Sequence, residues 1–322
     1  MGKRLLVLVM AVVVMAGGAG AAYGWDSYGH MAVAYVAYQK LTPQKKARVK
    51  ELMMLNPKYR EWMRWVPANA SPADKDMMVF MLAATWADEI KGKDSGYVPD
   101  GSAHGNRPEG SANPGANAGY DDKLMHKYWH FVDTPFAKDG TALPAIPAPN
   151  AEERIALFRG VLGSKSADGL KSYDLVWLLH LVGDIHQPLH CTTRVSKAEP
   201  LGDNGGNNEK LNCAGCAPVL HAFWDNLLGT GKTAQEVIQP AIETAKQLPV
   251  ADERLAAISD VKEWVTEGFE AAQRAVYQAP VGDGDGPFTM TSEYEKAAKA
   301  MAEKRVALAG ARLGNLINNE LI

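Results

Sequence analysis

Apolar and polar positions recur with the period of an α-helix along most of this chain. Five segments place apolar residues three and four positions apart, and each follows a residue type that commonly caps a helix. The predicted helices cover residues 43–55, 151–162, 173–187, 260–277 and 293–321, with Thr42 as a cap and Asn150, Ser172, Ser259 and Ser292 at their starts. No strand longer than a few residues is expected. The pattern predicts an all-α protein, a single mostly helical domain with long irregular loops.

The last predicted helix is apolar along one stripe and charged on the other, which is typical of a structural wall. Two stretches lack any helical period, residues 92–125 and 192–218, and both are rich in Gly and Asn. A loop as long as the first is usually functional or disordered. Histidines and acidic residues lie on both sides of each stretch, so neither is expected to separate two domains.

The first residues have the features of a secretory signal. Lys3 and Arg4 precede an apolar stretch, and small residues stand at the positions that a signal peptidase reads. We expect residues 1–24 to be a signal peptide that is cleaved after Gly24, leaving 25–322 as the single working domain. The mature protein is then secreted or periplasmic, without stable membrane association. An uncleaved N-terminal anchor is the alternative.

Charge and cysteine content limit the possible partners. The formal charge is −3, which argues against a basic surface that holds duplex DNA through many phosphates. A polyanionic substrate would therefore need bound cations. Secretion would permit a disulfide. Cys213 and Cys216 could close a small loop, or either could pair with Cys191.

The segment HLVGDIHQPLH concentrates three histidines and an aspartate in eleven positions. His180 and Asp184 are four residues apart, so they share one face of a helix. His190 follows a proline, where the chain can fold back over that face. Polar rings and a carboxylate cost desolvation energy unless something compensates them, and a metal ion would do so.

Similar donors occur elsewhere in the chain. WDSYGH, TWADEIK, YWHFVD and HAFWD supply further histidines and carboxylates, namely His30, Asp88, His130, His221 and Asp225. Together these make five histidines and three aspartates, too many for one tetrahedral ion and enough for two or three. Nitrogen and carboxylate ligands without thiolates suit zinc.

In their order, these motifs resemble the S1/P1 nuclease family, secreted trinuclear zinc enzymes related to zinc phospholipase C. The resemblance implies three Zn²⁺ per chain. Its nine ligand positions all have counterparts in this chain. One zinc would take Trp25, through its free amino group and carbonyl oxygen, with His30 and Asp184. A second would take Asp88, His130, His180 and the bridging Asp184, and a third would take His190, His221 and Asp225. Cleavage after Gly24 would create the Trp25 amine.

The resemblance also implies an activity, the endonucleolytic hydrolysis of single-stranded DNA and RNA to 5′-phosphorylated products, with possible 3′-nucleotidase activity. Asp88 and Asp184 would hold the two bridged zinc ions, and a hydroxide between these ions would attack phosphorus. The third zinc would stabilise the leaving 3′ oxygen. Lys91 would add charge at the phosphate. Phe131 would stack the base and Asp133 would bind its edge, with Asn207 as a further nucleotide contact. A monomer is expected.

Simpler roles are open for several of these residues. Phe131 could belong to the core, Asp133 could orient a ligand histidine, and Lys91 could be a solvated lysine at a helix end. His186 is expected to be a hydrogen-bonded structural histidine. His104 and His126, in or beside the long loop, are expected to be exposed to solvent.

The spacing between two candidate ligands departs from the family. Asp88 and His130 are separated by 41 residues, more than in the family's fungal and plant members. This insertion bears on substrate preference more than on chemistry.

Two other functions compete with a nuclease. A zinc phospholipase C is the first rival, although its last ligand is typically glutamate where this chain has Asp225. A zinc-storing protein without catalysis is the second.

Overall fold

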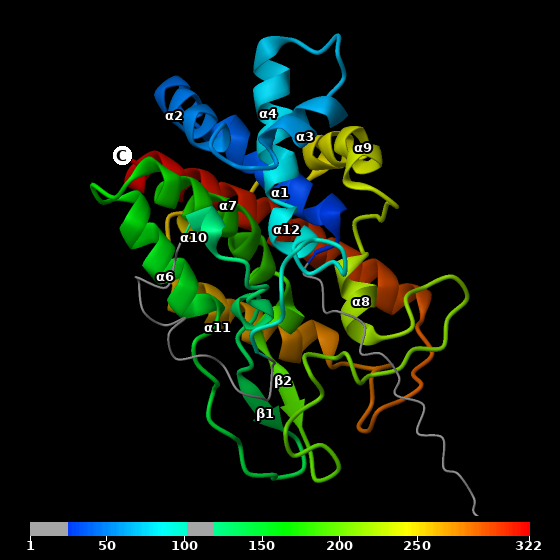
Figure 1. Ribbon diagram of the computed structural model, residues 1–322. Helices are drawn as coiled ribbons and strands as arrows, with labels where there is room; N and C mark the ends of the chain where they lie inside the picture. Colours follow the sequence, from blue (N-terminus) through cyan, green and yellow to red (C-terminus); the bar gives the residue numbers. More distant parts are fainter. Residues whose placement is uncertain (1–24, 102–118) are drawn as a thin grey trace, which may run out of the picture.

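The computed structural model describes residues 25–101 and 119–322 (Figure 1). The expected signal peptide and His104 lie outside these ranges. Short and long helices make up most of the described chain, as the all-α prediction stated. The α-helices are α1 (Ser27–Lys40), α2 (Pro43–Met53), α3 (Tyr59–Trp65), α4 (Pro72–Ala83), α5 (Trp86–Glu89), α6 (Ala151–Leu162), α7 (Asp168–Asp184), α8 (Leu220–Asp225), α9 (Ala234–Gln247), α10 (Glu253–Ala256), α11 (Val261–Ala271) and α12 (Ser292–Glu320).

Short elements connect these helices. Three are single 3₁₀ turns, and a π turn continues α11: η3 (Gly119–Asp121), η4 (Lys127–Trp129), η5 (Pro188–Cys191) and η6 (Ala272–Val276). Two three-residue strands, β1 (Pro135–Ala137) and β2 (Thr193–Val195), pair in parallel with Phe136 opposite Arg194. The prediction that strands stay very short is confirmed for the described residues.

Helix α7 forms the centre of the molecule. Every residue from Lys171 to Asp184 is buried, because α1, α2, α6 and α12 pack against different sides of the helix. A helix that is buried all round needs apolar residues on every face, which the segment LVWLLHLVG provides. The two polar residues at its C-terminal end, His180 and Asp184, are therefore held in a dry and rigid environment.

Helix α12 differs from the predicted amphipathic wall. Its middle, from Arg305 to Gly314, is buried on all sides, so the expected charged outer face does not exist there. Gly310 and Gly314 explain the close packing against α1. A Cβ atom on Gly310 would lie 2.5 Å from Val36 Cβ, and one on Gly314 would lie 2.9 Å from Lys40 Cβ.

The caps Thr42 and Asn150 are confirmed, and each accepts a hydrogen bond from the first turn of its helix. The predicted start at Ser172 is wrong, whereas Ser292 begins α12 as expected and Ser259 lies just before α11. Ser172 lies inside α7, where its hydroxyl donates to Leu52 O at 2.6 Å instead of capping a helix. Asp260 and Thr291 replace the neighbouring serines as caps of α11 and α12. None of the helices in the described ranges is both long and apolar enough to cross a membrane.

Candidate metal centre

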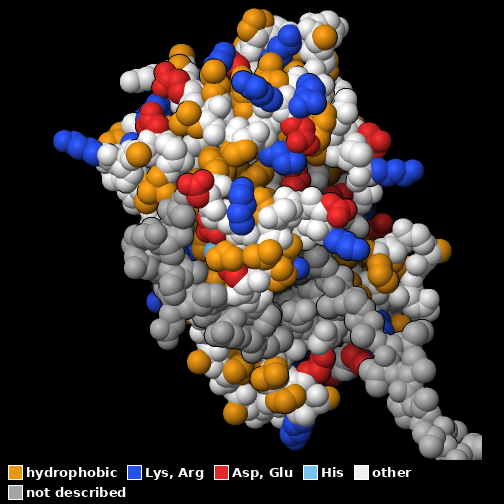
Figure 2. All heavy atoms as spheres, in the orientation of Figure 1, with side chains coloured by type: hydrophobic (Ala, Val, Ile, Leu, Met, Phe, Trp, Pro, Cys, Tyr) orange, Lys and Arg blue, Asp and Glu red, His pale blue; other side chains and the backbone are white. Residues whose placement is uncertain are grey.

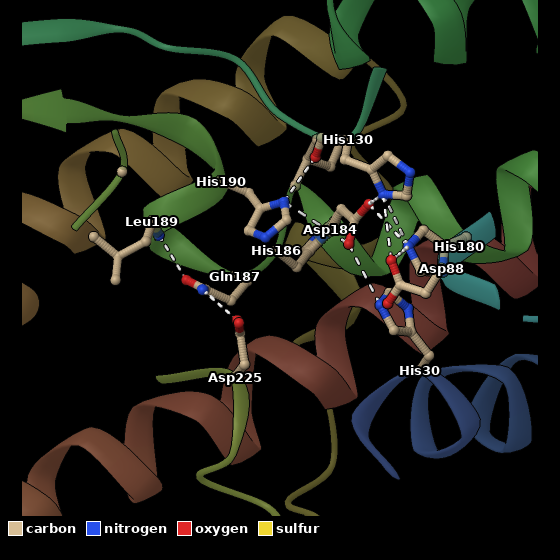
Figure 3. A network of polar contacts seen from close by, with 12 residues as sticks. His30, Asp88, His130, His180, Asp184, His186, Gln187, Leu189, His190 and Asp225 are labelled. Carbon is tan, nitrogen blue, oxygen red and sulfur yellow. Dashed lines mark hydrogen bonds and ion pairs between the residues drawn. The ribbon is translucent and has the colours of Figure 1, made fainter. Parts of the chain in front are cut away.

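Four elements bring polar side chains to Asp184 at the end of α7. Figure 3 shows His30 from α1, His130 after η4 and His180 from α7 facing its carboxylate, with Asp88 from α5 against the rings of His130 and His180. Asp184 and the three histidines are at most 1% exposed. Residues separated by up to 154 positions in sequence thus form one buried cluster.

The first group of candidate ligands is His30, His180 and Asp184. His30 Nε2 lies 3.4 Å from Asp184 Oδ1, and His180 Nε2 lies 3.3 Å from Asp184 Oδ2. The two imidazole rings stack at 3.7 Å. Gly183 makes room for them, because a Cβ atom there would come within 2.9 Å of His30 Nδ1.

The second group is Asp88, His130 and His180. Asp88 Oδ1 lies 3.4 Å from His180 Nε2 and 3.8 Å from His130 Nδ1. His130 Nδ1 is also 2.9 Å from Asp184 Oδ2. Asp184 therefore directs Oδ1 to His30 and Oδ2 to His130 and His180, as a carboxylate that bridges two ions would.

The third group is His190, His221 and Asp225. The Nε2 atoms of His190 and His221 face each other at 3.1 Å, and His221 Nε2 lies 3.6 Å from Asp225 Oδ2. His190 comes from the 3₁₀ turn after Pro188, which folds the chain back as the sequence suggested. His190 Nδ1 is 3.8 Å from Asp184 Oδ1, so this group adjoins the first two.

Backbone carbonyls orient three of the rings. The Nδ1 atoms of His180, His190 and His221 lie 2.7, 2.7 and 2.6 Å from Ala84 O, His130 O and Gly205 O. A carbonyl can only accept, so Nδ1 carries a proton in each ring and Nε2 is the nitrogen that faces the cluster. Gly205 begins the segment Gly205-Gly206-Asn207 and has a φ of 59°, which favours glycine. Its role as the partner of His221 was not predicted.

Several buried atoms of the cluster have no hydrogen-bond partner among the described residues. They are both ring nitrogens of His30, Nε2 of His130 and Oδ1 of Asp184. Unsatisfied buried polar atoms are rare, because each costs desolvation energy. Their convergence in three histidine and carboxylate groups fits metal ions better than a self-contained hydrogen-bond network.

The electrostatics agree with this interpretation. Burial and the nearby His180 lower the pKa of His30 to about 4, and burial with Lys91 lowers the pKa of His130 to about 3, so both rings are neutral as ligands must be. Burial opposes charge on His180 too, but Asp184 and Asp88 raise its pKa to about 10. The two carboxylates thus hold a positive charge between them, which a divalent cation would also supply.

Lys91 contacts this cluster directly. Its Nζ lies 2.5 Å from Asp88 Oδ1, and its side chain is 1% exposed. The alternative of a solvated lysine at a helix end is therefore wrong. A fixed cation beside a candidate ligand carboxylate is well placed to attract a phosphate.

The remaining predicted residues differ in their burial and in their contacts. Trp25 is fully buried, and its side chain packs against Gly29. Phe131 is partly buried against the main core, and Asp133 is 7% exposed, so both flank His130 from inside the fold. Asn207 donates to Asn204 O at 2.8 Å and so caps its own loop.

Two other histidines behave differently from each other. His186 is structural as predicted, with Nδ1 donating to Val182 O at 2.7 Å and Nε2 accepting from Arg312 at 3.0 Å. His126 is 1% exposed, so its predicted solvent exposure is wrong. Its Nδ1 lies 2.6 Å from Asp100 Oδ2, and its Nε2 lies 2.8 Å from Asp122 Oδ2.

The cysteine pairing and the surface charge can be compared with the expectations from composition. Cys213 and Cys216 form a disulfide, and Cys191 is a buried free thiol. Figure 2 shows that Lys, Arg, Asp and Glu side chains are interspersed on the face it presents. This face offers no continuous basic surface among the described residues, in keeping with the net charge.

Comparison with known proteins gives consistent results. A family model described as S1/P1 nuclease matches residues 25–321. Nuclease S1 of Aspergillus oryzae is 24% identical over 326 aligned positions, which cover 96% of this chain and 95% of that protein. Endonuclease 2 of Arabidopsis thaliana is 24% identical over 331 positions, covering 98% and 97% of the two chains. Endonuclease 4 of the same plant is 28% identical over 181 positions, about half of each chain.

Proposed function

The chain belongs to the S1/P1 nuclease family, and from this premise we propose that it is a zinc-dependent endonuclease of single-stranded DNA and RNA. Membership makes the protein a phosphodiesterase, and its substrates are nucleic acids. The proposal adds the metal, the strand preference and the products, which are 5′-phosphorylated nucleotides. It also includes removal of 3′ phosphates from mononucleotides, and a monomer that is secreted or periplasmic after cleavage behind Gly24.

The observation that supports the proposal best is the arrangement of three histidine and aspartate groups around Asp184, with partnerless buried atoms among them. These residues fit zinc, because they offer imidazole nitrogens and carboxylate oxygens with backbone carbonyls behind the rings. His30 and Asp184 would hold one ion, Asp88, His130, His180 and Asp184 a second, and His190, His221 and Asp225 a third. Bound zinc would supply Lewis acidity, which activates water near neutral pH and neutralises phosphoryl charge.

The N-terminal ligand is part of the proposal. Trp25 is buried beside Gly29 in the turn that leads to His30, and Asp26 N donates to Asp225 O at 3.1 Å. The start of the mature chain is therefore anchored next to two candidate ligands. We propose that the Trp25 amine and carbonyl complete the first site.

The protein's own groups would position the nucleic acid. Lys91 carries a fixed positive charge at Asp88, where it can bind a phosphoryl oxygen. Phe131 offers a partly buried ring beside His130, and stacking on a ring requires an unpaired base. Asp133 would accept from the base edge, and Asn207 would contact the nucleotide. The overall negative charge makes such local contacts necessary, because long-range attraction of the strand is weak.

Product analysis tests the proposal. The protein starting at Trp25 would be incubated with single-stranded DNA, single-stranded RNA and duplex DNA, before and after chelation and with zinc restored. We expect 5′-mononucleotides from the single strands, loss of activity with the chelator and recovery with zinc. Asp168→Asn, an exposed change at the other end of α7, serves as the control variant.

Other outcomes would exclude the proposal. Zinc-loaded protein that hydrolyses phosphatidylcholine but no nucleic acid would favour the phospholipase interpretation. Zinc binding without turnover of either substrate would indicate a storage protein. Cleavage of duplex DNA at the same rate as single strands would contradict the role of an unpaired base.

A further inference from the structure

The turn between Asp184 and His190 connects the bridged pair of sites to the third site. Its backbone is held by short-range bonds, with Gln187 N donating to Asp184 O at 2.8 Å and His190 N donating to Gln187 O at 3.0 Å. Helix α12 fixes it from behind, where Arg305 Nε donates to His186 O at 2.9 Å. The turn is therefore a rigid support from which a side chain can position its neighbours.

The side chain of Gln187 is fully buried and uses both ends of its amide. Its Nε2 donates to Asp225 Oδ1 at 2.8 Å, and its Oε1 accepts from Leu189 N at 2.6 Å (Figure 3). A backbone N–H can only donate, so the amide oxygen must face Leu189. The amide NH₂ is thereby directed at Asp225, and its orientation follows from the chemistry of both partners.

This bond determines which oxygen Asp225 presents to the third group. Gln187 occupies Oδ1, while Oδ2 faces His221 Nε2 at 3.6 Å. The backbone of Asp225 is held as well, since its carbonyl accepts from Asp26 N at 3.1 Å. Asp225 is thus fixed at two points, and its remaining oxygen is aligned with the two imidazoles.

We propose that Gln187 is a positioning residue for the third metal site. It acts through Asp225, presenting Oδ2 to the ion and connecting the third site to the turn that carries Asp184 and His190. The inference rests on the proposed function in assuming that this site holds zinc. Loss of a partner behind a ligand typically lowers metal affinity by roughly 10–100-fold, which sets the expected effect.

A purely local role is the competing explanation. The bond from Leu189 N to Gln187 Oε1 caps η5, and it would hold the turn without any effect on Asp225. The two roles use different atoms of one amide. They predict different results when Gln187 and Asp225 are changed together, because only a residue that acts through Asp225 loses its effect when Asp225 is replaced.

The experiment is a double-mutant cycle on zinc affinity. Wild type, Gln187→Met, Asp225→Ala and the double variant would be stripped of metal, titrated with Zn²⁺ against a graded chelator and assayed for retained zinc. Gln239→Met is the matched control, since Gln239 also donates to a carboxylate, Glu243 Oε1 at 2.9 Å, but on the exposed surface of α9.

We expect Gln187→Met to weaken one of three zinc equivalents by roughly 10–100-fold and to leave the other two unchanged. Asp225→Ala should weaken the same equivalent, and the double variant should be no weaker than Asp225→Ala. Unchanged affinity in Gln187→Met, or losses that add in the double variant, would overturn the proposal. If Asp225→Ala binds zinc with the same stoichiometry and affinity as wild type, the third site itself would be excluded.

A second variant tests the proposal if Gln187→Met does not fold. Gln187→Glu keeps the acceptor for Leu189 N, and its ionised carboxylate has no donor for Asp225. We expect the third equivalent to weaken in this variant too. Unchanged or tighter binding would assign Gln187 to the turn alone.

Discussion

Two buried clusters of histidine and carboxylate side chains in this molecule differ in how their charges are compensated. Around Asp184, ring nitrogens converge on one another and several buried atoms have no partner among the described residues. Around His126, each ring nitrogen lies within 2.8 Å of a carboxylate oxygen, and Tyr128 donates to Asp100 at 2.9 Å. The ring also stacks on Trp129 at 3.5 Å. Buried charge that is compensated internally supports the fold, whereas uncompensated donors indicate a ligand.

The strongest test of this comparison is Asp184→Asn. The carboxylate faces both His30 and His180, so its loss should release the two bridged zinc ions. Single-strand hydrolysis should fall by on the order of 10³-fold or more, since a catalytic metal contributes several kcal/mol. Zinc content by elemental analysis and product release would be measured together. Unchanged zinc content would remove Asp184 from its bridging role.

The corresponding change in the other group is Asp122→Asn. It leaves His126 with Asp100 alone, and removing one partner of a buried pair costs about 3 kcal/mol. Denaturant unfolding of the metal-free protein should show this loss, while zinc content stays at the wild-type value. Asp121→Asn, an exposed neighbour, is the control. Loss of zinc without loss of stability would reverse the assignment of the two groups.

An extra residue before Trp25 tests the N-terminal ligand. An alanine in front of Trp25 replaces the free amine with a peptide N–H, which cannot coordinate metal. We expect activity to fall about 100-fold, equivalent to about 2.7 kcal/mol in the barrier. The same alanine added after the exposed Ile322 should have no effect. Full activity of the N-terminally extended protein would exclude Trp25 as a ligand.

The smallest expected effect is a pH dependence of stability. Burial disfavours charge on His126, but Asp100 and Asp122 outweigh it and raise its pKa above 6.5. The stabilisation by this group is therefore complete below pH 6.5 and disappears as pH rises through the folded-state pKa. Each tenfold gain in the proton affinity of the folded state corresponds to about 1.4 kcal/mol of this stabilisation.

The measurement compares unfolding free energies of wild type and His126→Gln across this range. Their difference should shrink at alkaline pH. A constant difference would mean that folding does not raise the pKa of His126.

The sequence was sufficient for the helical class and for the groups of candidate ligands. His180 with Asp184, and His221 with Asp225, are spaced at one helical turn, so each pair had to share a face. The assignment of His30, Asp88 and His130 to particular groups depended on the family resemblance. Their positions are set by tertiary packing, which local spacing does not reveal.

The wrong predictions have physical causes that are non-local. His126 is buried because Asp100, 26 residues earlier, compensates its charge. Ser172 did not begin a helix, because its hydroxyl found Leu52 O on another element. Gln187 was visible in the motif but was not singled out, since its partner Asp225 lies 38 residues away.

The packing of α1 against α12 has a consequence for how the chain is made. Val36 and Gly310 are in close contact, so the helix that carries His30 gains the last of its packing partners only after almost the whole chain has emerged. Folding of such long-range contacts is slow, because the intervening loop must close first. A ribosome-bound or truncated chain that lacks α12 would leave the face of α1 around Val36 uncovered. Completion of the packing around the helix that carries His30 is thereby tied to completion of synthesis.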